Sequence, residues 1–285
     1  CMVSYSGPMV KGALNEGASP ISVALLRMLA AALLMLPYEA RQCVRRHIPM
    51  KLTPAQWGLT ALAAAFLAAH YITWITSLTG TSTFASVALV CTQPLFVAFF
   101  SYVLFQERTP RRALPGALLA LLGAVTIALS GLSGQEAQAT GQEALRSNLL
   151  ALAGAVLMAA HWLAGRQIRQ TLAAEVYTPV LYLITALLLA LCLPLSGGFR
   201  MPLSALPYMA GLVIGSTLLG HAVFAYALSG VSANVISFAL LGEPVGAMIF
   251  SMIFFGEVPT WPVALGGLPT LMGLALYLAF AGGEK

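Results

Sequence analysis

Residues 232–255, SANVISFALLGEPVGAMIFSMIFF, form an apolar run with a carboxylate, Glu243, and a proline, Pro244, at its centre. A helix needs roughly 20 mostly apolar residues to cross the hydrocarbon core of a bilayer, so this run is long enough to span a membrane. An acid at mid-depth costs about 2.5–3.5 kcal/mol on insertion scales. The run therefore predicts a transmembrane helix in which Glu243 faces protein, water or a ligand instead of lipid.

The rest of the chain has the same character. Hydrophobic residues make up 59% and charged residues only 8%, whereas a soluble domain has about 25% charged residues. This composition predicts an all-α integral membrane protein, with the lipid bilayer as a partner. The net charge of +5 lies mainly in short loops, where basic residues set the orientation in the membrane, so we expect no nucleic-acid partner.

Nine apolar segments follow a short N-terminal stretch, residues 1–14. They are residues 20–37, 55–78, 83–105, 112–132, 148–168, 176–195, 205–229, 232–255 and 261–281. Because the sequence begins with Cys1 instead of Met, we expect residues 1–14 to be the end of a truncated first helix. The sequence therefore predicts ten transmembrane helices.

The basic residues are distributed unequally between the predicted loops. With both termini in the cytoplasm, ten of them are cytoplasmic: Arg41, Arg45, Arg46, Lys51, Arg108, Arg111, Arg112, Arg166, Arg169 and Lys285. Only Lys11, Arg146 and Arg200 fall on the other side. This positive-inside bias predicts a multi-pass protein of the cell inner membrane with cytoplasmic termini.

Two parts of the chain match each other at a fixed offset of 150 residues. The matched pairs include Pro94 with Pro244, Glu107 with Glu257, Gly116 with Gly266 and Gly123 with Gly273. The match predicts two repeats, residues 1–133 and 148–285, joined by a loop at residues 134–147. Since each repeat holds five spans, the second enters the membrane from the opposite face. Such inverted repeats are typical of secondary transporters, whose substrate site lies between the halves.

The segments ASVALVCTQPLFVAFFSYVLFQER and NVISFALLGEPVGAMIFSMIFFGEVPTWPVALGGLPTLMG resemble the two EamA repeats of the drug/metabolite transporter (DMT) superfamily. The resemblance implies a ten-helix transporter fold. Members carry diverse metabolites, among them amino acids, nucleosides and choline, so it does not identify a substrate. No P-loop pattern occurs in the sequence, and we expect no coupling to ATP hydrolysis.

The repeat places Gln93 opposite Glu243, so one half offers an amide where the other offers an acid. The prolines that follow, Pro94 and Pro244, cannot donate a hydrogen bond, and we expect them to break their helices and free backbone carbonyls at membrane depth. Acid and carbonyls together suit a proton, a cation or a substrate ammonium. The other interpretation is that Glu243 only bonds a neighbouring helix.

Arg27 lies inside the second predicted span. A guanidinium there either binds a substrate carboxylate or phosphate or serves helix packing or the lipid interface, and the second interpretation is slightly favoured because relatives with different substrates look similar here. Lys11 is near a helix end, and we expect its side chain to extend to the membrane surface.

Histidines and aromatic residues provide further candidates for the substrate site. Three histidines, His70, His161 and His221, lie in predicted spans, where each either titrates, binds a ligand or makes a structural hydrogen bond. Tyr71, Trp74, Trp162 and Tyr226 accompany them. Such rings are suited to a planar or cationic ligand, although packing is the commoner role of each one alone.

Glu107 and Glu257 end the fourth and ninth spans, and we expect each to cap the helix that follows it. The paired glycines, Gly116 with Gly266 and Gly123 with Gly273, predict close helix approach.

The sequence as a whole predicts secondary transport of a small polar or aromatic metabolite, such as an amino acid or nucleobase, by alternating access. Proton coupling is an option, and no cofactor or metal is expected. The alternative is an organic-cation transporter in which Glu243 and an aromatic cage hold an ammonium. A non-transport membrane protein, either an enzyme or a scaffold, is the least favoured alternative. We do not expect an enzyme, because the sequence has no His-x-x-x-His, paired-Asp or Ser-centred motif. A monomer and a homodimer are both compatible with the sequence.

Overall fold

The computed structural model describes residues 3–130, 141–219 and 233–281, and these ranges contain helices and no strand. In chain order the elements are η1 (Val3–Tyr5), α1 (Ser6–Asn15), α2 (Pro20–Arg45), α3 (Pro54–Ser77), α4 (Thr83–Val90), α5 (Gln93–Phe105), η2 (Arg111–Ala113), α6 (Leu114–Ser130), α7 (Gly141–Ile168), α8 (Ala174–Leu191), η4 (Leu193–Ser196), η5 (Leu203–Ala205), α9 (Leu206–Ala210), η6 (Gly211–Leu219), α11 (Ala233–Phe255) and α12 (Trp261–Ala281). The all-α class is confirmed.

Seven helical stretches within the described ranges are long and apolar enough to cross a membrane. They are Pro20–Arg45, Pro54–Ser77, Thr83–Phe105, Arg111–Ser130, Gly141–Ile168, Ala174–Ser196 and Trp261–Ala281. Two shorter apolar helical stretches lie at Leu203–Leu218 and Glu243–Phe255, and α1 is a short helix at the start of the described residues. The chain therefore has the ten-helix organisation of the predicted membrane fold.

The two prolines of the repeat behave differently. The predicted span at residues 83–105 is two helices, since α4 ends at Val90 and α5 begins at Gln93. Pro94 lies in the first turn of α5, where the missing N–H leaves no hydrogen bond unmade. The break expected at Pro244 is wrong, because α11 continues through it. A helix tolerates one lost hydrogen bond when the residues on both sides keep theirs.

Two helix boundaries also differ from the prediction. Helix α2 passes Pro37 and extends to Arg45, so it carries a polar turn beyond the apolar segment. Helix α7 begins at Gly141, inside the segment predicted as a loop. In both cases a helix that is stabilised by packing extends past the apolar residues that indicated it.

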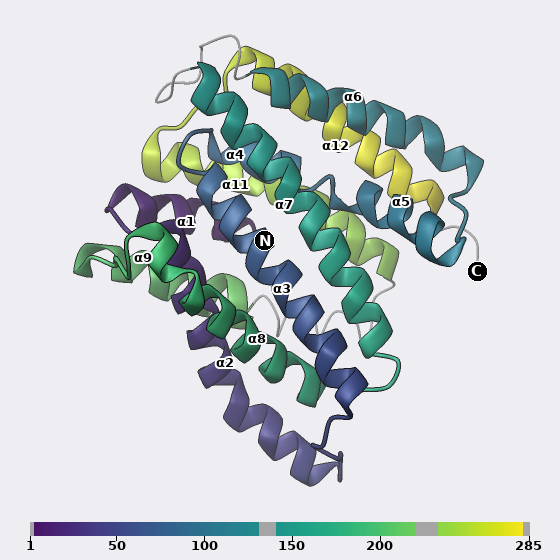
Figure 1. Ribbon diagram of the computed structural model, residues 1–285. Coiled ribbons are helices and arrows are strands. Elements are labelled where there is room, and N and C mark those ends of the chain that lie inside the picture. Colours follow the sequence, from purple (N-terminus) through teal and green to yellow (C-terminus); the bar gives the residue numbers. More distant parts are fainter. Residues whose placement is uncertain (1–2, 131–140, 220–232, 282–285) are drawn as a thin grey trace.

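The helices pack mainly in three pairs: α2 with α8, α3 with α7, and α6 with α12. Figure 1 shows α3 and α7 crossing the middle of the molecule, with the α2–α8 pair below and the α6–α12 pair at the upper right. Helix α11 lies against η1, α4 and α12. The middle of the bundle is therefore lined by helices that come from both halves of the sequence.

The α6–α12 pair confirms the close approach predicted from glycines. A Cβ atom on Gly116 would lie 2.7 Å from the carbonyl oxygen of Gly273, and one on Gly273 would lie 2.6 Å from that of Gly116. The same reciprocal contact joins Gly123 and Gly266, at 2.5 and 2.7 Å. Only glycine permits backbones this close.

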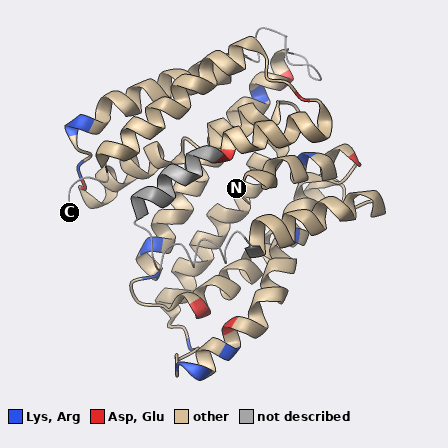
Figure 2. Cartoon of the chain, turned by 180° about the vertical axis from the view of Figure 1, so that it is seen from behind, with Lys and Arg blue, Asp and Glu red and all other residues tan. Residues whose placement is uncertain are grey.

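The charged residues mark the two ends of the bundle. Most of the basic segments in Figure 2 lie along the left side and the bottom of the view. In the sequence, basic residues cluster where α2 ends, where α5 joins α6 and where α7 ends. We call the end with these clusters the basic end. The opposite end holds the α1–α2 and α3–α4 connections and the start of α7.

Candidate functional site

The candidate site is centred on three neighbouring side chains, those of His70, Tyr71 and Trp74. All three side chains are buried on α3. The His70 ring stacks on Trp74 with centroids 5.8 Å apart, and its Nδ1 lies 2.9 Å from the carbonyl oxygen of Gly154 on α7. That hydrogen bond fixes the imidazole, while Nε1 of Trp74 has no hydrogen-bond partner in the described part of the chain.

Arg27 reaches this group from α2. Its guanidinium carbon lies 5.1 Å from the centre of the Tyr71 ring. Nη1 donates to Oγ of Ser6 at 3.1 Å, and Nε donates to Oγ1 of Thr217 at 3.2 Å. The side chain is only 8% exposed. Arg27 therefore lies inside the bundle and joins α1, α2, α3 and η6, so the lipid-interface interpretation is wrong and both the packing and the binding interpretations remain.

Glu243 lies near the middle of α11 and is partly buried. It is within electrostatic range of Arg27, and also of Cys91 at the gap between α4 and α5. The described residues form two ion pairs, Arg46–Glu175 and Arg166–Glu107. Arg27 and Glu243 thus bring a guanidinium and a carboxyl group into one region of the bundle, and the described residues show no ion pair between them.

Gln93, the repeat partner of Glu243, begins α5 directly after that gap. Its Oε1 atom is buried and makes no hydrogen bond to any described residue. An amide oxygen buried without a donor costs free energy, so this acceptor is available to a water or a ligand N–H.

The other predicted residues are less central. Nδ1 of His161 lies 2.9 Å from the carbonyl oxygen of Ala63, so this ring links α7 to α3. Trp162 is 41% exposed, and the structure does not bring it into the His70 group. His221 and Tyr226 lie outside the described residues.

Sequence reasoning missed two hydroxyl groups of the site, Ser6 and Thr217, and misjudged Lys11. Serine and threonine are too common in membrane helices to stand out, and no spacing links either one to Arg27.

Lys11 does not extend to the surface. It is 8% exposed and donates to the carbonyl oxygens of Leu78 at 2.6 Å and Thr81 at 3.3 Å. Leu78 caps the end of α3 and Thr81 lies in the connection to α4, so Lys11 fastens α1 to this connection.

The paired acids also have unexpected partners. Glu257 accepts from the backbone N and Oγ1 of Thr83, both at 2.7 Å, so it caps α4 and not the following helix α12. Glu107 accepts from Arg166 at 2.6 and 2.9 Å. This hydrogen bond lowers the pKa of Glu107 below its usual value of 4.5. The expected capping of the following helices is wrong because spatially adjacent helices supply nearer donors.

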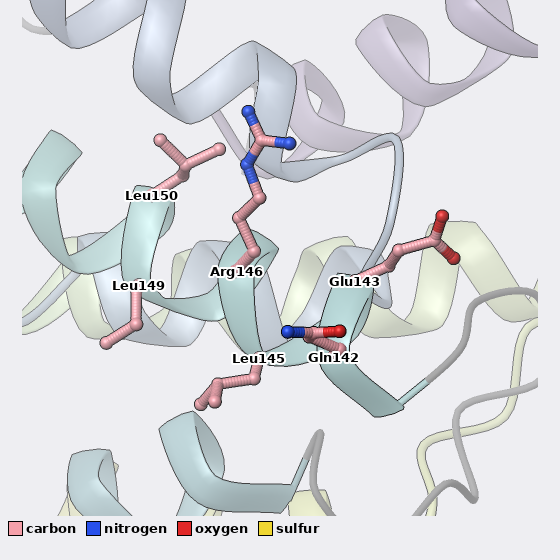
Figure 3. A pocket seen from close by; sticks show the side chains of 6 residues that line it. All are labelled: Gln142, Glu143, Leu145, Arg146, Leu149 and Leu150. Atoms are coloured by element: carbon pink, nitrogen blue, oxygen red, sulfur yellow. The ribbon is translucent and has the colours of Figure 1, made fainter.

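A surface hollow lies at the start of α7, away from these residues. Figure 3 shows its lining of Gln142, Glu143, Leu145, Arg146, Leu149 and Leu150. All six residues come from one helix. None of them belongs to the central group, by which we mean His70, Tyr71 and Trp74 together with Arg27 and Glu243. Convergence of polar groups from several helices characterises a ligand site, so the central group is the better candidate.

Two of three comparisons with known proteins gave matches, and both agree with this architecture. The sequence model of the EamA-like transporter family matches residues 1–129 and 145–279. No curated protein matches the chain. A solved structure described as "Crystal structure of protein" is similar over 99% of this chain and 96% of its own, with 18% sequence identity and a TM-score of 0.65, which supports the fold alone. The family match covers nearly the whole sequence, and the chain belongs to the EamA-like transporter family of the DMT superfamily, a group of multi-pass membrane transporters.

Proposed function

We propose that the chain is a secondary transporter that moves a small polar or aromatic metabolite across the cell inner membrane by alternating access. The observation that carries the proposal is that two ionisable groups, the guanidinium of Arg27 on α2 and the carboxyl group of Glu243 on α11, lie in one region inside the bundle, each without an ion-pair partner in the described residues. Arg27 belongs to the first repeat and Glu243 to the second. Substrate sites of inverted-repeat transporters lie between the two repeats.

The surroundings of these two groups suit a small, planar or polar substrate. Tyr71 and Trp74 offer aromatic faces, and Gln93 offers an amide oxygen that accepts from no described residue. Glu243 and the histidines are candidates for proton coupling, since ionisable groups inside membrane helices are functional by default. We place the basic end in the cytoplasm, as the positive-inside rule favours.

A counterflow experiment tests transport. The full chain is reconstituted in liposomes that are loaded with an unlabelled amino acid, nucleobase or amine, and uptake of the labelled compound is followed. Transient accumulation in liposomes with protein, and none in empty liposomes, supports the proposal. If no compound that raises the melting temperature of the purified protein gives counterflow, the proposal is wrong.

The second candidate is transport of an organic cation. It is favoured by the carboxyl group of Glu243, which pairs with no described residue, and by the aromatic rings of Tyr71 and Trp74, which together resemble an ammonium cage. The nearby positive charge of Arg27 opposes it. Counterflow of choline and other quaternary amines, with none of amino acids or nucleobases, would favour this candidate.

A further inference from the structure

The hydrogen bonds of Arg27 leave part of its guanidinium unused. Ser6 accepts from Nη1 and Thr217 accepts from Nε, and Nη2 donates to no described residue. Both acceptors are neutral hydroxyls that hold the side chain without compensating its charge. The group is therefore fixed in position with donors still free, as a binding site for a carboxylate requires.

Arg27 forms no ion pair with any described residue, although Glu243 lies within electrostatic range of it. The two described ion pairs use Arg46 and Arg166, whose side chains are 65% and 50% exposed. Arg27 is 8% exposed and belongs to neither pair. A buried charge without a partner is unfavourable, so an anionic ligand at this place would gain more from Arg27 than from an exposed arginine.

A second donor without an acceptor lies close by. Trp74 is 6% exposed, and its Nε1 atom is buried with no hydrogen-bond partner in the described residues. Its ring lies 6.3 Å from that of Tyr71, which in turn lies under the Arg27 guanidinium. Nη2 of Arg27 and Nε1 of Trp74 are thus two donors near one tyrosine ring that find no acceptor among the described residues, and such donors suit an acceptor group and not a cation.

We propose that Arg27 binds the carboxylate of the transported substrate and that the indole N–H of Trp74 is a second donor to the bound molecule. A carboxylate fits better than a phosphate, because one guanidinium balances a single negative charge and Glu243 adds another acid nearby. This inference rests on the proposed transport function and assigns its substrate class, a small monocarboxylate that includes amino acids.

The test uses matched pairs of acids and primary amides on the purified full chain. The panel contains the protein amino acids, benzoate, nicotinate and indole-3-acetate, each beside its amide, in a thermal-shift screen followed by calorimetric titration of the hits. Acids are expected to bind roughly 30-fold or more tightly than their amides, as removal of one partner of a buried charge pair usually costs this factor or more.

Variants assign this preference to the proposed residues. Arg27→Gln is expected to abolish the difference between acid and amide, whereas Arg46→Gln, in an exposed ion pair, is expected to retain it. If Arg27→Gln does not fold, Trp74→Phe provides a second measurement and is expected to weaken acid binding by roughly tenfold. The acid–amide comparison on the wild-type protein requires no variant at all.

The results that overturn the carboxylate site differ from those that overturn transport. Amides that bind as tightly as acids, binding by amines alone, or a panel in which no acid binds would each refute a role for Arg27 in substrate binding. Counterflow of such an amide or amine would still establish the transport function. Likewise, if adenine or choline is transported and no acid binds, the transport function is supported and the carboxylate site is refuted.

Discussion

The α6–α12 contact predicts that a change of glycine to alanine affects stability differently at two glycines, Gly123 and Gly58. At Gly123 a Cβ atom would lie 2.5 Å from the carbonyl oxygen of Gly266 and from the backbone N of Thr270, whereas ordinary contact begins at 3.4 Å. The helices must therefore separate by roughly 1 Å. At Gly58 on α3 no atom lies within 4 Å of the same Cβ.

The expected magnitudes follow from these distances. Overpacking against backbone atoms costs about 1–3 kcal/mol, while alanine improves helix propensity over glycine by about 1 kcal/mol. Gly123→Ala should therefore be neutral to destabilising by about 2 kcal/mol, and Gly58→Ala should be stabilising by up to about 1 kcal/mol. The Gly123 variant is expected to melt several degrees below the Gly58 variant.

The assay compares melting temperatures of the two purified variants with wild type in one detergent and at one heating rate, because unfolding of such proteins is often irreversible. Gly273→Ala repeats the test on α12, since its Cβ would lie 2.6 Å from the carbonyl oxygen of Gly116. A Gly123→Ala protein that melts above the Gly58→Ala protein would refute the close packing of α6 on α12.

Three further predictions concern charges and donors. Trp74→Phe should weaken binding of a carboxylate ligand by roughly tenfold in a titration, whereas Trp57→Phe, at a side chain that is 47% exposed, should not. Glu243→Gln should abolish transport or its dependence on pH in proteoliposomes while the protein still folds, and normal pH-dependent transport by this variant would exclude a coupling role. Because Arg166 lowers the pKa of Glu107, their pair stabilises the fold above pH 4.5 and stops doing so as pH falls through the lowered pKa. Glu107→Gln should therefore lower the melting temperature at neutral pH and leave it unchanged in strong acid, and an equal loss at both would contradict this.

Features that repeat or extend along the chain were predictable from the sequence. Apolar length gave the membrane helices, and the offset of 150 residues identified the glycines that meet between α6 and α12. Both signals are local or periodic. The division into repeats at residues 1–133 and 148–285 stays a prediction, as do the cytoplasmic termini, the oligomeric state and the role of each site residue.

Partners of polar side chains were predictable only in part. Lys11 bonds carbonyls that lie 67 and 70 positions away, and Glu257 bonds Thr83 at a separation of 174. No spacing in the sequence indicates such partners, because they depend on which helices become neighbours. The sequence favoured the membrane surface as the place of the Lys11 side chain and the following helix as the partner of Glu257. Both expectations are wrong.

The inverted repeat helps to separate residues that serve the fold from residues that serve transport. The repeat pairs Gly116 with Gly266 and Gly273 with Gly123, so the Gly116–Gly273 contact has an equivalent in the Gly266–Gly123 contact. Because both copies of the contact are present, it can be kept when the two repeats exchange conformations. Such contacts belong to the scaffold.

Glu107 and Glu257 differ from the glycines in this respect. Their local backbones agree closely: the preceding residues, Gln106 and Gly256, have φ of 58° and 64°, and each acid donates its N–H to a serine carbonyl at 3.3 Å. Yet one carboxylate caps α4 and the other pairs with Arg166. Alternating access requires the two halves to exchange conformations, so contacts made by only one member of a repeat pair are those expected to change during transport. Gln93 and Glu243 are also a repeat pair whose members differ, since only Glu243 can carry a charge. The search for substrate and proton contacts should therefore begin at these two residues and at Arg27, which lies within electrostatic range of Glu243.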